Sequence, residues 1–239
     1  MKRLIIYSIV SILSGATITY AGEQSPEGHL HRMETGFNAY SMFALFHGYS
    51  YTLDFGGNGS LSLKAVIEFP PMLWLSKGSV TALRIKTGAE YSLRFPAVWE
   101  AGIGLFQECL FQSQVLGNFQ TVGLDGRVYF GAILDSVSFG VFGDIQSSLW
   151  TFVQLSEFSL DAFEEQYTGS GASPASGVVT STAFNITAGV YGYFGVGGNT
   201  VLKTELGLKY TPSEYVGFGG GMMFGLLPFH LSVSISYGL

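Results

Sequence analysis

The feature that most constrains this chain is a two-residue rhythm of apolar and polar side chains, which begins near residue 35 and continues to the C-terminus. The rhythm is clearest at the end of the chain, where the apolar positions are Phe229, Leu231, Val233, Ile235, Tyr237 and Leu239. Successive side chains of a β-strand point to opposite faces, whereas a helix repeats about every 3.6 residues. The chain is therefore predicted to be all-β, with strands that have one apolar and one polar face.

Similar runs predict about eight to ten antiparallel strands, and we favour ten. The expected strands lie near residues 37–55, 60–69, 83–94, 99–105, 122–132, 137–146, 184–194, 202–210, 215–224 and 229–239. Turn-forming clusters separate these runs, for example at 56–59, 135–136 and 195–199. Eight strands would result if two short runs merged.

The apolar content points to a membrane, although no segment after the first 21 residues resembles a membrane helix. Hydrophobic residues make up 47% of the chain and charged residues 12%. The best helical candidate, 218–231, is interrupted by glycines and by Pro228, which oppose a helix. A closed barrel spreads its lipid-facing residues over every second position. We therefore predict a transmembrane antiparallel up-and-down β-barrel. A soluble sandwich or lipocalin-like barrel is the alternative, in which the polar face meets water.

The start of the chain predicts export. Lys2 and Arg3 precede an apolar stretch at 4–19, and a small-x-small site ends at Ala21. We expect a signal peptide at 1–21, a periplasmic lead-in at 22–34, and the outer-membrane barrel at 35–239 with a long loop at 154–182. An uncleaved N-terminal anchor is the alternative for the first segment. The expected location is the bacterial outer membrane.

Charged residues inside the predicted strands share one parity in each strand, opposite to the large apolar residues. The predicted set is Lys64, Glu68, Arg84, Lys86, Glu90, Arg94, Glu100, Glu108, Asp125, Arg127, Asp144, Lys203, Glu205 and Lys209. A charge facing lipid at mid-depth would cost roughly 2–4 kcal/mol, so these side chains are predicted to face the lumen. Positive and negative charges balance, which favours an interior salt-bridge network and a plugged or thin polar channel over a general porin.

The long loop at 154–182 is acidic in its first half and rich in serine and glycine in its second half. It could act as an adhesion surface, which is the alternative function. Counting ten strands back from the C-terminus puts this loop at the same end as the chain termini. Barrels of this class place their long loops at the opposite end. We therefore expect an error in the count, either before Phe55 or within the loop.

Other candidate sites have weaker patterns. His230 and Ser232 resemble the His-x-Ser pair of outer-membrane lipid hydrolases, but no acidic or amide residue follows Ser232 to orient the histidine. His29 and His31 could bind a metal, although two ligands on a tail make a weak site. Cys109 is predicted to be structural. We predict no enzyme activity, no cofactor and no metal site, and the net charge of −6 argues against nucleic-acid binding.

The signal peptide, the alternating strands and the apolar positions of 229–239 resemble small outer-membrane barrel families, the OmpW-like and the OmpX- or OmpA-barrel-like proteins. The chain departs from these families at its last residue, Leu239, where Phe or Trp is usual. The resemblance implies insertion by the barrel-assembly machinery with periplasmic chaperones. It also implies roles that range from passage of small solutes to adhesion to host ligands or envelope integrity.

Overall fold

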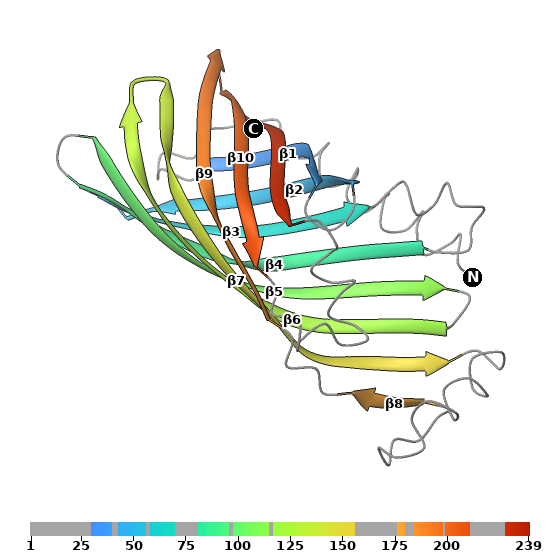
Figure 1. Cartoon of the computed structure of the whole chain (residues 1–239). Coiled ribbons are helices and arrows are strands. Elements are labelled where there is room, and N and C mark those ends of the chain that lie inside the picture. Colours follow the sequence, from blue (N-terminus) through green and yellow to red (C-terminus); the bar gives the residue numbers. More distant parts are fainter. Residues whose placement is uncertain are drawn as a thin grey trace.

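The computed structural model is a closed antiparallel barrel of ten strands (Figure 1). It describes residues 30–39, 43–55, 58–69, 81–95, 98–114, 117–155, 176–179, 184–197, 199–210 and 228–239. The barrel strands are β1 (Leu30–Ala39), β2 (Phe43–Asp54), β3 (Gly59–Phe69), β4 (Thr81–Arg94), β5 (Trp99–Gln114), β6 (Gly117–Leu134), β7 (Val137–Leu155), β9 (Phe184–Gly197), β10 (Thr200–Tyr210) and β11 (Phe229–Gly238). The predicted signal peptide at 1–21 lies outside the described residues.

The barrel has up-and-down topology, because each strand pairs with its sequence neighbours and the first strand pairs with the last. The closing pair, β1 with β11, runs from Arg32 opposite Gly238 to Asn38 opposite Ser232. β7 pairs with β9 up to Ser147 and then with the short strand β8 (Ser176–Val179), which lies outside the ring. Closure leaves no open sheet edge in the ring, as a lipid environment requires. No helix long and apolar enough to cross a membrane occurs in the described part of the chain.

The region 37–55, predicted as one strand, contains two strands, β1 and β2. The apolar rhythm continues across the short connection between them, so the alternation alone did not reveal the turn. β1 also begins at Leu30, inside the segment predicted as a periplasmic lead-in. The strand predicted near 215–224 lies outside the described residues. The barrel still has ten strands, as predicted. The division of the N-terminal region into β1 and β2 supplies one strand more there than was predicted.

With β1 and β2 counted as separate strands, β7 and β9 are joined at the barrel end opposite to the start of β1. The tight connections β2–β3, β4–β5, β6–β7 and β9–β10 lie at one end of the barrel, the turn end, together with Leu239, whose amide donates to the carbonyl of His31. The longer connections β3–β4, β7–β9 and β10–β11 join strands at the opposite end, the loop end. The β6–β7 hairpin turns at Asp135, whose positive φ of 45° is tolerated by Asp more readily than by most residues.

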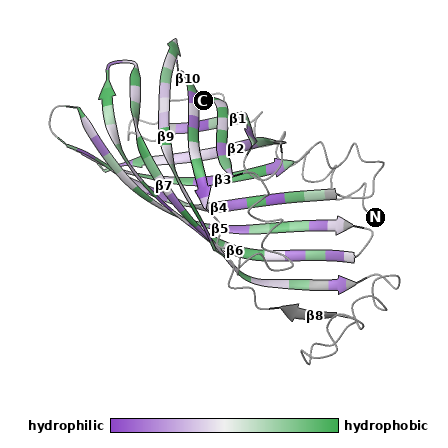
Figure 2. Ribbon diagram, viewed as in Figure 1, coloured by the Kyte–Doolittle hydropathy of each residue, from purple (hydrophilic) through white to green (hydrophobic). Residues whose placement is uncertain are grey.

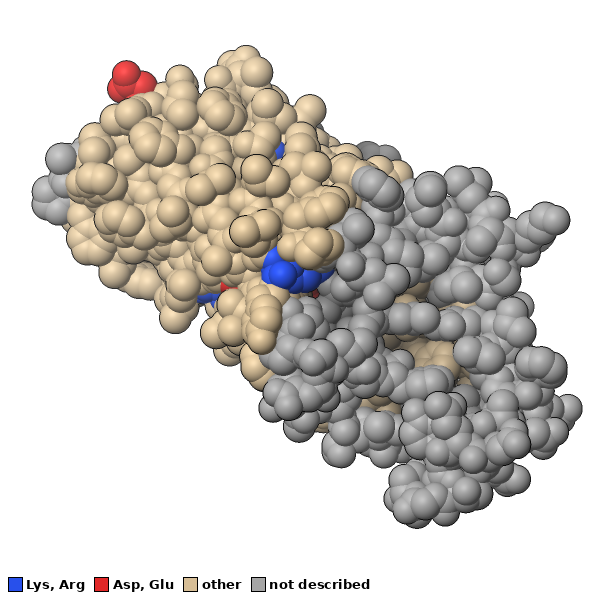
Figure 3. Space-filling model, in the orientation of Figure 1, with Lys and Arg blue, Asp and Glu red and all other residues tan. Residues whose placement is uncertain are grey.

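The outer wall of the barrel is apolar, and its side chains are sorted by height. Aliphatic side chains occupy the middle of the strands, and aromatic side chains lie toward both ends, as Phe139, Val141, Ile145 and Trp150 show along β7. Phe139 and Trp150 are separated by about 36 Å along the strand, or about 25 Å along the axis for a tilt near 45°. This height matches the apolar band of transmembrane barrels. Hydrophobic and hydrophilic residues are interspersed along the strands (Figure 2), and among the described residues the face seen in Figure 3 carries few charges.

Candidate functional site

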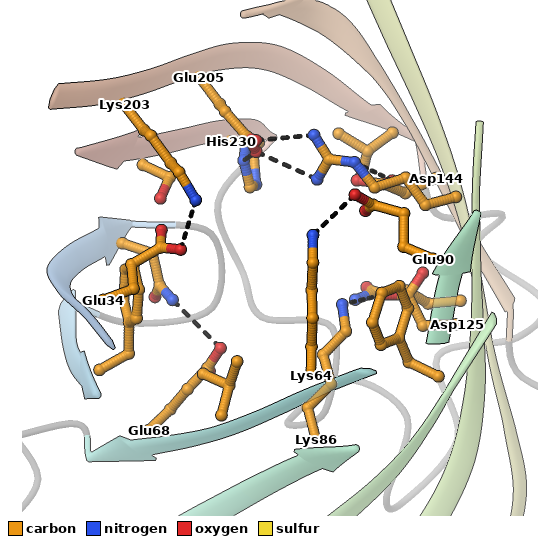
Figure 4. A pocket seen from close by; sticks show the side chains of 18 of the residues that line it. Glu34, Lys64, Glu68, Lys86, Glu90, Asp125, Asp144, Lys203, Glu205 and His230 are labelled. Carbon is orange, nitrogen blue, oxygen red and sulfur yellow. Dashed lines mark hydrogen bonds and ion pairs between the residues drawn. The ribbon is translucent and has the colours of Figure 1, made fainter. Parts of the chain in front are cut away.

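The candidate site is the lumen, to whose lining each of the ten barrel strands contributes residues; Figure 4 shows part of it. A cavity of about 160 Å³ lies within it, large enough for on the order of ten water molecules. Of the predicted residues, ten line this cavity: Lys64, Glu68, Lys86, Glu90, Asp125, Arg127, Asp144, Lys203, Glu205 and Lys209. The structure places Arg84 beside the loop-end side of the cavity, and Arg94 and Glu100 near the turn end.

One contact in the lumen joins two strands that are not neighbours in the ring. Arg127 on β6 donates two hydrogen bonds to Glu205 on β10, with Nη2–Oε1 at 2.6 Å and Nη1–Oε2 at 3.2 Å. Two barrel strands, β7 and β9, separate these elements in the ring. Tyr193 also donates to Glu205, at 3.2 Å, and His230 Nε2 lies 3.2 Å from the same carboxylate. The Glu205 carboxylate is therefore the centre of a tie across the lumen.

Arg127 is supported from its other side as well. Its Nε lies 3.8 Å from Oδ1 of Asp144 on β7, and its guanidinium carbon lies 4.8 Å from the centre of the Phe142 ring. The same ring packs edge-on against His230. A planar guanidinium suits this arrangement, because it can form paired hydrogen bonds while it stacks on an aromatic face.

A second cluster surrounds Lys86. Its ammonium contacts Asp125 and lies 3.8 Å from Glu108, while it stands 4.6 Å above the centre of the Phe106 ring. Phe106 reaches this position because the facing residue on β4 is Gly88, where an added Cβ would come within 2.6 Å of the ring. The glycine therefore leaves room for the Phe106 ring, which packs against the Lys86 ammonium group.

Two further pairs complete the middle of the lumen. Lys64 donates to Glu90 at 2.7 Å, between neighbouring strands. Lys203 donates to Glu34 at 2.7 Å, and Ser234 donates to the same carboxylate at 2.5 Å. Glu34 was not among the predicted lumen residues, because the sequence pattern placed it in the lead-in before the barrel. Its parity with Asn38, another inward residue of β1, was the signal that could have identified it.

The loop end of the lumen holds a buried polar layer. Glu68 accepts a hydrogen bond from Asn38 at 3.2 Å and pairs with Arg84 at 3.4 Å. From the opposite wall, Asn185 donates to Gln146 at 3.1 Å, within a layer of buried amide and hydroxyl groups. These neutral side chains were not predicted, because their sequence pattern does not distinguish a lumen layer from an ordinary polar strand face.

Tyrosines fill much of the lumen toward the turn end. Tyr129 donates to Glu100 at 3.0 Å and meets Tyr191 edge-on, and Tyr191 lies 4.8 Å from Tyr193 between ring centres. A Cβ at Gly102 would lie 2.2 Å from the Tyr129 ring, so the absence of a side chain there lets the ring lie against the wall. The tyrosine layer, Tyr129, Tyr191 and Tyr193, therefore narrows the lumen on the turn-end side of the cavity.

The structure shows the neighbours of two of the histidines that the sequence singled out, His230 and His31. His230 and Ser232 both line the cavity, and Glu205 supplies the acidic neighbour that the sequence did not show. However, Glu205 occupies Nε2 of His230 and is itself bound by Arg127. His31 lies in β1 beside Tyr49 and Tyr51, and His29 is outside the described residues. No group of three metal-ligating side chains occurs among the described residues.

Comparisons with known proteins found distant structural likenesses and no sequence match. No protein-family model matches the sequence. No curated protein matches it either. Among solved structures, it resembles the translocator domain of the autotransporter NalP from Neisseria meningitidis, with 12% identity, 99% and 96% of the two chains covered, and a TM-score of 0.39. An outer-membrane channel from Pseudomonas putida gives 9% identity, 92% and 98% coverage and a TM-score of 0.47. A deletion mutant of the monoaromatic hydrocarbon channel TodX gives 6% identity, 90% coverage of each chain and a TM-score of 0.41.

Proposed function

We propose that this protein is a bacterial outer-membrane barrel that supports the envelope and lets only small polar solutes pass. Two features support the location: the apolar band of the outer wall and the predicted signal peptide at 1–21. Insertion would then require the barrel-assembly machinery and periplasmic chaperones, and outer-membrane lipid would be the partner of the outer wall. The loop end would face the cell exterior, since β1 begins and β11 ends at the turn end.

The observation that carries the permeation proposal is the size and chemistry of the lumen. The cavity holds about 160 Å³, and the Arg127–Glu205 tie forms part of its lining. General porins have 16 to 18 strands and leave an open aqueous channel, whereas barrels near eight strands are filled by their own side chains. A ten-strand ring with ionic ties lies close to the filled limit. We therefore propose low conductance and a small size limit.

A catalytic role is not part of this proposal. In an acyl-transfer triad the histidine must be free to take a proton from the serine hydroxyl. Here the Nε2 atom of His230 faces Glu205, which Arg127 and Tyr193 also hold. This arrangement suits a structural tie. We propose that the protein is not an enzyme and needs no cofactor.

Planar-bilayer recording of the purified, folded protein tests the proposal. We expect conductance steps well below those of a general porin, together with faster gel migration before boiling than after it. Replacing Tyr191 by Ala should enlarge the steps, because it removes one ring of the tyrosine layer. A complete lack of conductance in both proteins would remove the permeation role. Fractionation of the native protein with inner membranes would contradict the proposed location.

A further inference from the structure

The lumen contains nearly equal numbers of acidic and basic groups, but these groups are not equally accessible to a solute. Lys64 is 30% exposed, while its partner Glu90 is 14% exposed. Lys86 is 21% exposed, while its partners Asp125 and Glu108 are 2% and 1% exposed. Both lysine side chains extend into the space that the lining residues surround (Figure 4), and in both clusters the lysine side chain is more exposed than its acidic partners.

The two lysines stand on neighbouring strands of one wall. Lys64 on β3 lies opposite Gly88 on β4, and Lys86 lies opposite Val66. This register makes them diagonal neighbours, about 7 Å apart at the backbone, on the lumen face. Because Gly88 has no side chain, nothing from that position separates them. The wall formed by β3 and β4 thus presents two ammonium groups to the same space.

The other pairs do not offset this polarity. Lys203 and Glu34 are about equally exposed, at 24% and 29%, and Arg127 and Glu205 are matched as well. Of these four pairs, two therefore expose the basic side chain more than its acidic partner, and two have no preferred sign. Interactions are strong in a narrow, poorly solvated space, so the orientation of the pairs counts more than their net charge.

We propose that the cavity selects small anions over cations, and that Lys64 and Lys86 are the groups that meet them. For passage through the barrel this inference rests on the proposed permeation function, whereas for binding in the cavity it does not. The favoured ligand class is a compact inorganic anion or small carboxylate, because the two ammonium groups share a cavity of about 160 Å³.

Reversal potentials in a potassium chloride gradient test selectivity. We expect chloride to permeate about twofold or more better than potassium in the wild type. The decisive variant is Lys64→Gln/Glu90→Gln, which leaves the net charge unchanged and removes one inward-pointing pair. Its selectivity should fall toward unity, whereas a mechanism based on net charge predicts no change. Glu34→Gln should raise the chloride preference. The turn variant Asp135→Asn is the control and should behave as wild type.

A binding measurement keeps the inference testable if the barrel does not conduct. The thermal midpoint in detergent is measured in inorganic phosphate and in sodium chloride at equal ionic strength. Phosphate should raise the midpoint more for the wild type than for Lys64→Gln/Glu90→Gln, while a general salt effect would act on both alike. If the barrels do not conduct but show this difference in thermal midpoint, the permeation role is overturned and the anion site is supported. Conducting barrels that prefer potassium, or equal phosphate effects in the two proteins, would overturn the anion site.

Discussion

The tie between Arg127 and Glu205 provides the most direct test of how the lumen stabilises the barrel. Glu205→Leu removes the acceptor of two guanidinium hydrogen bonds, at 2.6 and 3.2 Å, and of the Tyr193 hydroxyl. Loss of one partner of a buried pair costs roughly 3–5 kcal/mol. Both side chains here keep about 15% exposure to the cavity, which lowers the cost, so we expect a loss near the lower limit, about 3 kcal/mol.

A double-mutant cycle separates the tie from its surroundings. Arg127→Leu should also cost about 3 kcal/mol, because it leaves Asp144 and Glu205 without their guanidinium. The double variant should cost much less than the two losses added together, with a coupling energy of roughly 2–3 kcal/mol. Urea unfolding in lipid vesicles, followed by tryptophan fluorescence, measures these differences.

The chain offers a matched control for this cycle. Arg94 and Glu100 form the same type of pair at 3.7 Å, but Arg94 is 70% exposed at the turn end. An exposed pair contributes about 0–1 kcal/mol, so Arg94→Leu should have a small effect. If Glu205→Leu destabilises the barrel no more than Arg94→Leu does, the reasoning that ionic ties across the lumen stabilise this fold is refuted.

The outer wall and the lumen allow further predictions. Leu105→Arg places a charge in the middle of the apolar band and should cost about 2–4 kcal/mol in vesicles, whereas Leu134→Arg, at the end of β6, should cost about 0–1 kcal/mol; equal losses would contradict the membrane-facing wall. Cys109 has the outward parity of β5. In vesicles its thiol should therefore resist a hydrophilic maleimide, whereas the unfolded protein in urea should react. Rapid labelling of the folded protein would argue against lipid contact. Gly102→Leu should displace Tyr129 and lower stability, as measured by the same urea titration. Gly126→Ala should have little effect, because the nearest atom to its Cβ position, the carbonyl oxygen of Ile145, is 3.9 Å away.

The sequence by itself determined the features that depend on local geometry. Because side chains alternate along any strand, the parity of Lys64, Arg127 and Glu205 could be assigned without knowledge of the fold. The same rhythm predicted an all-β barrel and strands such as β11 (Phe229–Gly238). It did not reveal the turn between β1 and β2, because the alternation continues across this short connection. Glu34 was missed because the alternation was recognised only from about residue 35 onward.

Only the tertiary structure decided which of these side chains meet. Arg127 and Glu205 are 78 residues apart, and Glu34 and Lys203 are 169 apart, so no local pattern connects them. Their contact depends on the number of strands in the ring and on the register at which β1 pairs with β11. The depth of each charge was likewise set by the wall around it, because the exposure of Lys64 and the burial of Asp125 depend on strands from distant parts of the chain. Parity is a property of the covalent chain, whereas partners and exposure arise only when the barrel closes.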